Sequence, residues 1–167
     1  MPERQALLLG VSGRPLLFLD VDGVLNPYGW PSRPAGFTEH QLFPGEEPVL
    51  INPAHGAWIT ELTGVCDVIW ATAWNQDANR LLAPLLHIEP LPVLTIQRTP
   101  LRPSAKLPVI AAFAQRRPLA WIDDEHPPEA RSWSASRAEP TLLITADPAA
   151  GLTRNMVDQA ISWAAVR

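Results

Sequence analysis

The chain has 167 residues, 47% of them hydrophobic and 18% charged, which fits one domain with a sizeable core and excludes wholesale disorder. Thirteen Lys and Arg against 17 Asp and Glu give a net charge of −4, which argues against a protein held to nucleic acid mainly by a basic surface but leaves a local basic groove open. One cysteine, Cys66, excludes an internal disulfide, and the longest N-terminal apolar run, residues 6–9, is too short for a signal peptide or a membrane span, so we expect a cytoplasmic protein with no membrane partner.

Five apolar runs have the length and composition of buried strands. In chain order they are Leu16–Leu19, Val65–Ala71, Leu91–Ile96, Leu119–Ile122 and Thr141–Thr145. Pro92 interrupts the third run, because proline cannot donate to a strand ladder, and this predicts an edge strand. Helices are expected between and after these runs, over Ala54–Leu62, Gln76–Leu86, Ala105–Gln115 and Thr153–Val166, the last with Thr153 as its N-cap.

Alternation of apolar strands with helices predicts an α/β fold with a mostly parallel, Rossmann-like sheet of about five strands and helices on both faces. We expect residues 1–167 to form a single domain. Ligands of such sheets bind just beyond the carboxyl ends of the strands. The ends of the predicted strands are therefore where functional side chains are sought.

Residues 27–53 make a connection too long for an ordinary turn inside a domain. The segment is rich in Pro and Gly and also carries aromatic side chains, namely Tyr28, Trp30, Phe37 and Phe43. Its aromatic content predicts an ordered flap. Two roles for the large side chains remain open: contact with a substrate, or packing on the sheet that anchors the flap.

Acidic side chains follow two of the predicted strands. Asp20 and Asp22 come directly after the first strand, and Gly23 permits the sharp turn that this exit needs. Asp123 and Asp124 follow the fourth strand. Close carboxylates repel each other unless a cation compensates, and an oxygen-rich site favours Mg²⁺ over Zn²⁺. The alternative is that these residues only form turns at strand ends.

Two further residues stand at similar places. Thr72 puts a hydroxyl at the end of the second strand, and Lys106 lies near the start of a predicted helix. A lysine there has the wrong sign for the helix dipole, which predicts an anion or a carboxylate nearby. A solvated lysine on the helix surface is the alternative.

These segments, in this order, resemble the motifs of the haloacid dehalogenase (HAD) superfamily of aspartyl-phosphate enzymes. The matching stretches are LLFLDVDGVLN (16–26), VIWAT (68–72), Lys106 and LAWIDDE (119–125). The resemblance implies that Asp20 is a nucleophile and that Asp22 is the general acid and then the general base. A carboxylate at position 22 is a phosphatase feature that the haloacid dehalogenases lack, whereas Val24, where Thr is commoner, does not identify a subfamily.

The resemblance also implies the ligands of the phosphoryl group and of Mg²⁺. Thr72, the adjacent Ala73 and Lys106 would bind the phosphoryl group. Asp20, Asp123 and the backbone carbonyl of Asp22 would bind Mg²⁺, with Asp124 coordinating directly or through water. The implied reaction is Mg²⁺-dependent hydrolysis of a phosphate monoester. Transfer of the phosphoryl group to an acceptor other than water, and a non-catalytic module that binds phosphate, are the alternatives.

The intervals between these motifs leave no room for a large cap domain, so a capless or minimally capped protein is expected. An open site suits a nucleic-acid end, and it suits a small molecule if the flap or a second copy of the chain in a homodimer closes over it. The stretches 20–27 and 71–79 resemble small HAD proteins grouped with RNA-repair phosphatase domains, which implies a phosphorylated polynucleotide end as substrate. Base-stacking or phosphate-binding candidates are Trp30, Trp74, Arg98 and Arg102, with packing against the sheet edge as the alternative for Trp74.

Several other residues are expected to have structural roles. The four histidines, His40, His55, His87 and His126, show no spacing typical of metal ligands. Trp121 and Trp133 are expected to pack in or beside the core.

Overall fold

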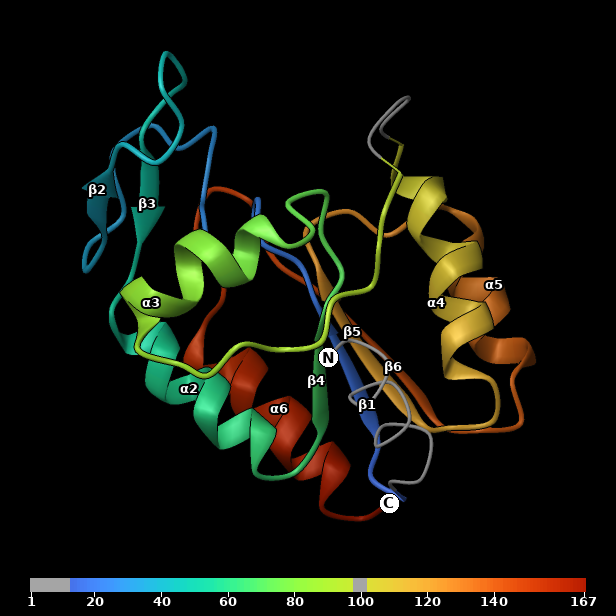
Figure 1. Ribbon diagram of the computed structural model, residues 1–167. Coiled ribbons are helices and arrows are strands. Elements are labelled where there is room, and N and C mark those ends of the chain that lie inside the picture. The colour runs from blue at the N-terminus through green and yellow to red at the C-terminus, as the bar shows by residue number, and fades with distance from the viewer. Residues whose placement is uncertain (1–12, 98–101) are drawn as a thin grey trace.

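A parallel sheet organises the chain, and the computed structural model describes it for residues 13–97 and 102–167 (Figure 1). Within these ranges the main sheet has four strands in the order β4-β1-β5-β6. Their bounds are β1 Leu16–Leu19, β4 Asp67–Trp70, β5 Leu119–Asp123 and β6 Thr141–Thr145. The predicted α/β class with a Rossmann-like parallel sheet is confirmed.

The prediction of a strand over Leu91–Ile96 is wrong. The segment runs beside β4 at the sheet edge but makes a single bridge there, between Trp70 and Val93. The Trp70 N–H donates to the carbonyl of Pro92, and the Leu94 N–H donates to the carbonyl of Trp70, each at 2.9 Å. Because Pro92 has no N–H, the parallel ladder cannot continue toward the start of the segment.

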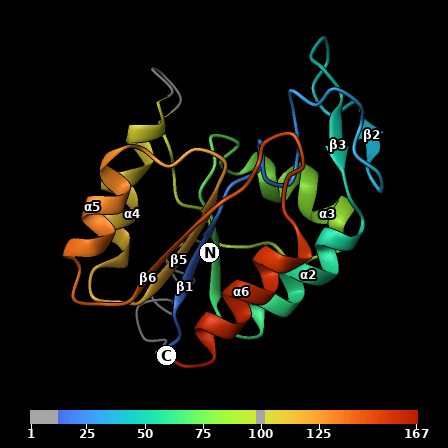
Figure 2. The same cartoon turned by 180° about the vertical axis from the view of Figure 1, so that it is seen from behind.

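Helices cover both faces of the sheet (Figures 1 and 2). On one face lie α2 (Ala54–Thr63) and α6 (Arg154–Ala164), and on the other lie α4 (Lys106–Ala114) and α5 (Glu129–Ser136). Side chains of β1 alternate between them: Leu17 and Leu19 belong to the first core, Leu16 and Phe18 to the second. Burial on both faces explains why the strands read as continuous apolar runs. None of the described helices combines the length and the apolarity that crossing a bilayer requires.

The predicted helices exist with changed details. The stretch Gln76–Leu86 folds as a π-helical turn, η1 (Ala78–Leu82), followed by α3 (Ala83–Leu86), and α4 is preceded by a 3₁₀ turn, η2 (Pro103–Ala105). Thr153 is the N-cap of α6, as predicted, with its side chain accepting a hydrogen bond from the N–H of Met156. Helix α5 was not predicted, because it is short and mostly polar and only Ala130 of its residues is buried.

The long segment 27–53 is an ordered flap that stands beyond the carboxyl ends of the strands (Figure 1). It contains an antiparallel pair, β2 (Thr38–His40) and β3 (Val49–Ile51). Hydrogen bonds join it to the body: the Leu50 N–H donates to Oδ1 of Asn26 at 2.9 Å, the Tyr28 N–H donates to the carbonyl of Pro148 at 2.8 Å, and the Tyr28 hydroxyl donates to Asp124 at 2.6 Å. The aromatic residues therefore belong to a segment with a defined position.

Candidate active site

The register of the sheet brings three predicted site residues to one edge. Leu19 pairs with Trp70 on one side and with Ile122 on the other, so β1, β4 and β5 end level with one another. Asp20, Thr72 and Asp123 follow or end these strands, and all three are buried. A cavity of about 280 Å³ opens there, which we call the phosphoryl cavity. The predicted residues that line it are Asp20, Asp22, Thr72, Ala73, Lys106, Asp123 and Asp124.

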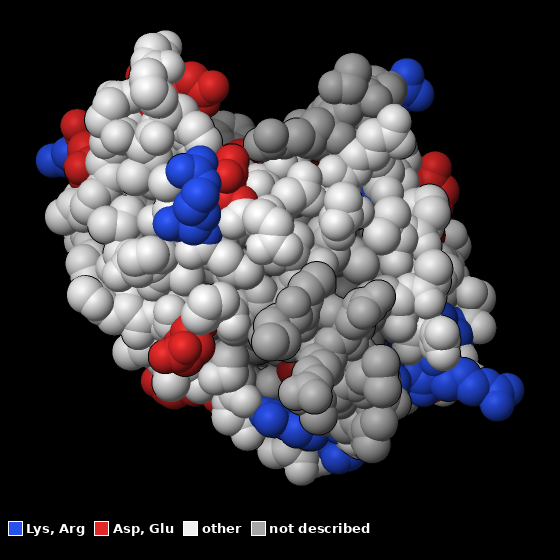
Figure 3. Space-filling model, viewed as in Figure 1, with Lys and Arg blue, Asp and Glu red and all other residues white. Residues whose placement is uncertain are grey.

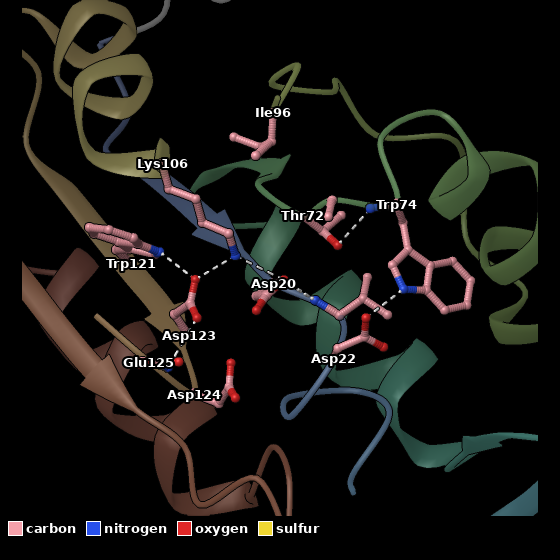
Figure 4. Close-up of polar contacts among 12 residues, drawn as sticks. Asp20, Asp22, Thr72, Trp74, Ile96, Lys106, Trp121, Asp123, Asp124 and Glu125 are labelled. Atoms are coloured by element: carbon pink, nitrogen blue, oxygen red, sulfur yellow. Dashed lines mark hydrogen bonds and ion pairs between the residues drawn. The ribbon is translucent and has the colours of Figure 1, made fainter. Parts of the chain in front are cut away.

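Lys106 lies between two carboxylates (Figure 4). Its Nζ is 3.0 Å from Oδ1 of Asp20 and 2.7 Å from Oδ2 of Asp123, and the side chain is only 9% exposed. Burial by itself would lower the pKa of this ammonium, but the two carboxylates outweigh burial and raise it above its ordinary value. These are the carboxylate partners that a lysine at the start of a helix requires.

Asp123 is held from three sides. Its Oδ2 accepts from Lys106 and, at 3.1 Å, from the indole Nε1 of Trp121, while its Oδ1 accepts from the N–H of Glu125 at 3.1 Å. Burial favours the protonated acid, but Lys106 and the N–H of Glu125 outweigh it and hold the pKa of Asp123 below its ordinary value. Trp121, expected to pack in the core, is fully buried and also orients this carboxylate.

Asp20, Asp123 and Asp124 form a group that fits a divalent cation. Each offers one carboxylate oxygen, and the three oxygens lie within 4.8 Å of one another. Burial, reinforced by the neighbouring Asp123 carboxylate, raises the pKa of Asp20 well above its ordinary value and also raises that of Asp124. Lys106 opposes this effect at Asp20 but supplies only one positive charge for three carboxylates. A hard cation with oxygen ligands would relieve this excess charge, and Mg²⁺ matches such a donor set.

Gly23 makes room for Asp124. Its φ is +77°, in the left-handed region that side chains disfavour, and a Cβ there would lie 2.5 Å from the carboxyl carbon of Asp124. The loop after β1 is tight, with the N–H groups of Val24, Leu25 and Asn26 all directed at the carbonyl of Val21. Glycine is therefore required both for the turn and for the acidic group.

The carboxylate of Asp22 lies outside the cation group. Its Oδ2 accepts from the indole Nε1 of Trp74 at 3.1 Å, and its Oδ1 accepts from Nδ2 of Asn26 at 3.0 Å. Figure 4 shows Asp22 and Trp74 on one side of Asp20, with Lys106 and Asp123 on the other. The predicted metal ligand at position 22 is the backbone carbonyl, a different atom, and its role stays a prediction.

Thr72 faces the phosphoryl cavity from the end of β4. Its Oγ1 accepts a hydrogen bond from the Trp74 N–H at 3.1 Å, so the hydroxyl hydrogen is free to turn toward an anion in the cavity. Thr72 and Lys106 lie on either side of Asp20 (Figure 4), as two donors to one phosphoryl group would.

A second and larger cavity, of about 740 Å³, lies between the flap and the body of the protein. We call it the flap cavity. Trp30 and Trp74 line it, and neither lines the phosphoryl cavity. Asp22 and Tyr28 line both cavities, so the two meet at these residues. Trp74 also packs edge-on against Phe43, with the ring centroids 4.9 Å apart. Its predicted role in binding a ligand stays a prediction.

Sequence reasoning missed the role of Asn26 and the contact that Tyr28, expected only as a flap aromatic, makes with Asp124. Asn26 orients Asp22 and also anchors the flap; an amide four residues after the acid in a tight loop was a usable signal. The Tyr28 hydroxyl donates to Oδ2 of Asp124 at 2.6 Å, a contact across 96 residues that no local pattern marks. Of the two candidate arginines, Arg102 lines the phosphoryl cavity, and Arg98 lies outside the described residues.

Comparison with known proteins gives one family match. The sequence pattern of the family described as "HAD domain in Swiss Army Knife RNA repair proteins" matches residues 16–157. The match spans both acidic groups, Thr72, Lys106 and the whole flap. A search of curated proteins found no match.

Proposed function

Because this chain belongs to the family of HAD domains found in Swiss Army Knife RNA repair proteins, we propose that it is a Mg²⁺-dependent phosphatase that hydrolyses phosphate monoesters through Asp20. The observation that carries the proposal is the position of Lys106 between Asp20 and Asp123, with Asp22 on the opposite side of Asp20. This arrangement supports a nucleophilic role for Asp20 beside a cation, and a separate role for Asp22 as the acid that protonates the leaving group.

In the first step the Asp20 carboxylate attacks the phosphorus atom, and the bond from phosphorus to the leaving oxygen breaks. The N–H of Val21 and the Nζ of Lys106 both contact Oδ1 of Asp20, at 2.8 and 3.0 Å, which orients the carboxylate for attack. Asp22 gives its proton to the leaving oxygen. The products are a free alcohol and an acyl phosphate on Asp20.

In the second step Asp22, now ionised, takes a proton from water, and the resulting hydroxide attacks the acyl phosphate. The bond from phosphorus to Asp20 breaks, inorganic phosphate leaves and the Asp20 carboxylate is restored. Trp74 and Asn26 keep the Asp22 carboxylate in place for both proton transfers, because each holds one of its oxygens.

Charge on the phosphoryl oxygens is met by Lys106 and by the hydroxyl of Thr72. Asp20, Asp123 and Asp124 would hold Mg²⁺, which would act as a Lewis acid and offset negative charge on the phosphoryl oxygens. Arg102, which lines the same cavity, adds a further positive charge near its rim.

A second candidate follows from the family description: the substrate is a phosphorylated nucleic-acid end. Transfer to an acceptor other than water is the other variant of the same chemistry. We place the reaction in the cytoplasm, which is a proposal made from the sequence.

Phosphate release with Mg²⁺ tests the function, over aryl phosphates, nucleotides, sugar phosphates and oligonucleotides phosphorylated at the 3′ or 5′ end. Asp20→Asn keeps the shape of the nucleophile but removes its charge, and it is expected to abolish turnover. Asp158→Asn, an exposed change on α6, is the matched control and is expected to be fully active. Activity of Asp20→Asn within a few-fold of the parent would rule out the mechanism. Appearance of a new phosphate ester when glycerol is added would identify a phosphotransferase.

A further inference from the structure

The flap cavity lies where a leaving group must go. It meets the phosphoryl cavity at Asp22 and Tyr28. If Asp22 protonates the leaving oxygen, as the proposed function states, the rest of the leaving alcohol extends past Asp22 into the flap cavity. The chemistry of this cavity then selects the substrate.

Four aromatic side chains line the flap cavity. Tyr28, Trp30, Phe43 and Trp74 all line it, together with apolar side chains such as Leu50. The ring of Tyr28 is held at the junction of the two cavities by the hydrogen bond from its hydroxyl to Asp124. Aromatic faces attract both flat apolar groups and cations, the latter through the ring quadrupole.

The charges that line the flap cavity are all negative. Asp22, Glu39, Glu46 and Glu47 face it, and no Lys or Arg is among the described residues that line it. Glu39 is paired with Arg33 at 2.8 Å, whereas Glu46 and Glu47 form no ion pair within residues 13–97 and 102–167. Figure 3 shows acidic side chains gathered on the lobe that the flap forms. The flap cavity thus presents a negative potential to whatever enters it.

We propose that the flap cavity binds a leaving group that carries a positive charge, such as an ammonium, on a flat or apolar body. The carboxylates attract the charge and the aromatic walls bind both the charge and the body. A polynucleotide threaded through the same cavity would place further phosphates against Glu46 and Glu47, which this arrangement disfavours. The inference rests on the proposed function and names a small cationic alcohol, not a nucleic-acid strand, as the leaving-group class.

Three aryl phosphates of nearly equal size test this proposal. They are 4-(trimethylammoniomethyl)phenyl phosphate, its uncharged carbon isostere with a neopentyl group, and the anionic 4-(carboxymethyl)phenyl phosphate. The methylene group insulates the phenol, so intrinsic reactivities are close. We expect kcat/KM to fall from cation to isostere by about tenfold and to fall again for the anion, as expected for charges partly screened by water.

Two pairs of variants distinguish the local effect of Glu46 and Glu47, which we call the acidic rim, from the effect of the protein's net charge. Glu46→Gln combined with Glu47→Gln is expected to lower the cation-to-isostere ratio of kcat/KM several-fold, while Asp22 and the aromatic walls keep part of the preference. Glu89→Gln combined with Glu129→Gln removes the same charge away from both cavities and is expected to leave that ratio unchanged. If the Glu46/Glu47 variant keeps the parent's ratio, or if the ratio falls equally in both double variants, the acidic rim does not select the substrate.

The outcomes also distinguish this proposal from the proposed function. Equal turnover of the three aryl phosphates, preference for the anion, or faster turnover of a 5′-phosphorylated oligonucleotide would overturn the cationic leaving group and leave the phosphatase standing. If no phosphate is released from any substrate, calorimetric titration with the three parent phenols decides the issue. Tighter binding of the cationic phenol would then support a cation-binding flap cavity, although the proposed phosphatase activity would be wrong.

Discussion

The indole Nε1 of Trp74 donates a hydrogen bond to Oδ2 of Asp22 at 3.1 Å and so joins the loop after β4 to the loop after β1. Asn26 holds the other oxygen at 3.0 Å, and the ring of Phe43 packs edge-on against the indole at 4.9 Å. The carboxylate proposed as acid and base is therefore oriented by its own loop and by a tryptophan that the flap supports. Trp74 also lines the flap cavity, so a ligand bound there would lie beside the ring that holds this carboxylate.

Trp74→Phe keeps an aromatic ring but removes the N–H that Asp22 accepts from. We expect kcat to fall by about tenfold with little change in KM, because the acid loses one of two groups that orient it. Steady-state kinetics on an aryl phosphate, beside a melting curve, measure this. Trp163→Phe, on α6 and far from the site, is the control. A loss of activity that tracks a loss of thermal stability would mean that Trp74 only packs.

Mg²⁺ is expected to raise both the activity and the melting temperature, because it binds the folded acidic group and not the unfolded chain. Asp123→Asn should weaken the Mg²⁺ dependence of the rate more than Glu125→Gln does. Both residues line the phosphoryl cavity, but Asp123 alone belongs to the group of three close carboxylates. Titration of activity against Mg²⁺ checks this order. Full activity in EDTA would show that the cation site is misassigned.

Lys106→Met is expected to destabilise the metal-free protein by about 3–5 kcal/mol, since removing one partner leaves buried charge uncompensated. The carboxylates of Asp20 and Asp123 lose their shared cation, and Mg²⁺ should recover part of the loss. Denaturant unfolding with and without Mg²⁺ measures both effects. Arg131→Met, on the exposed face of α5, removes a cation that pairs with neither carboxylate and should change stability little. Equal stability of Lys106→Met and the parent would contradict the ion-pair geometry.

Trp30→Ala separates the two roles left open for the flap aromatics. If Trp30 contacts the leaving group, kcat/KM falls strongly for the preferred substrate but barely for phenyl phosphate, which is too small to reach it. Comparison of the two substrates in one preparation measures this difference. An equal loss on both, together with a lower melting temperature, would assign Trp30 to anchoring the flap.

His55 makes stability depend on pH. It is fully buried, with Phe37 at 5.6 Å and Trp58 at 5.2 Å from its ring, and neither ring nitrogen has a hydrogen-bond partner among the described residues. Burial, opposed weakly by the backbone of Leu152, lowers the pKa of His55 from 6.5 to about 4. The folded state favours neutral imidazole, so the stabilisation is present above pH 6.5 and is lost as pH falls toward 4.

The expected loss from this residue is about 3 kcal/mol in the free energy of unfolding between pH 7 and pH 4. Urea unfolding of the parent and of His55→Leu over this range measures the contribution. The unfolding free energy of the parent minus that of the variant should fall as pH falls. A pH-independent difference for His55→Leu would place its pKa near that of a solvated histidine.

The strands and the acidic residues at their ends could be predicted from the sequence. A strand buried on both faces reads as an unbroken apolar run, as Leu16–Leu19 and Leu119–Ile122 do. Because parallel strands end at one edge, the placement of Asp20 and Asp123 follows from the order of the runs alone. The ordered flap was expected for a related reason, since its aromatic residues need something to pack against.

Tertiary structure alone decided features that depend on partners distant in sequence. Helix α5 is short and mostly polar and is held by its position beside β6. The segment Leu91–Ile96 has strand composition, but Pro92 lacks the N–H that would extend its pairing. The contacts of Trp74 with Asp22 and of Tyr28 with Asp124 join residues 52 and 96 positions apart. Local sequence patterns indicate which face of a helix or strand is buried, because apolar residues repeat with the period of that element. They do not report which polar atom meets which, because that depends on how loops from different strands converge at the sheet edge.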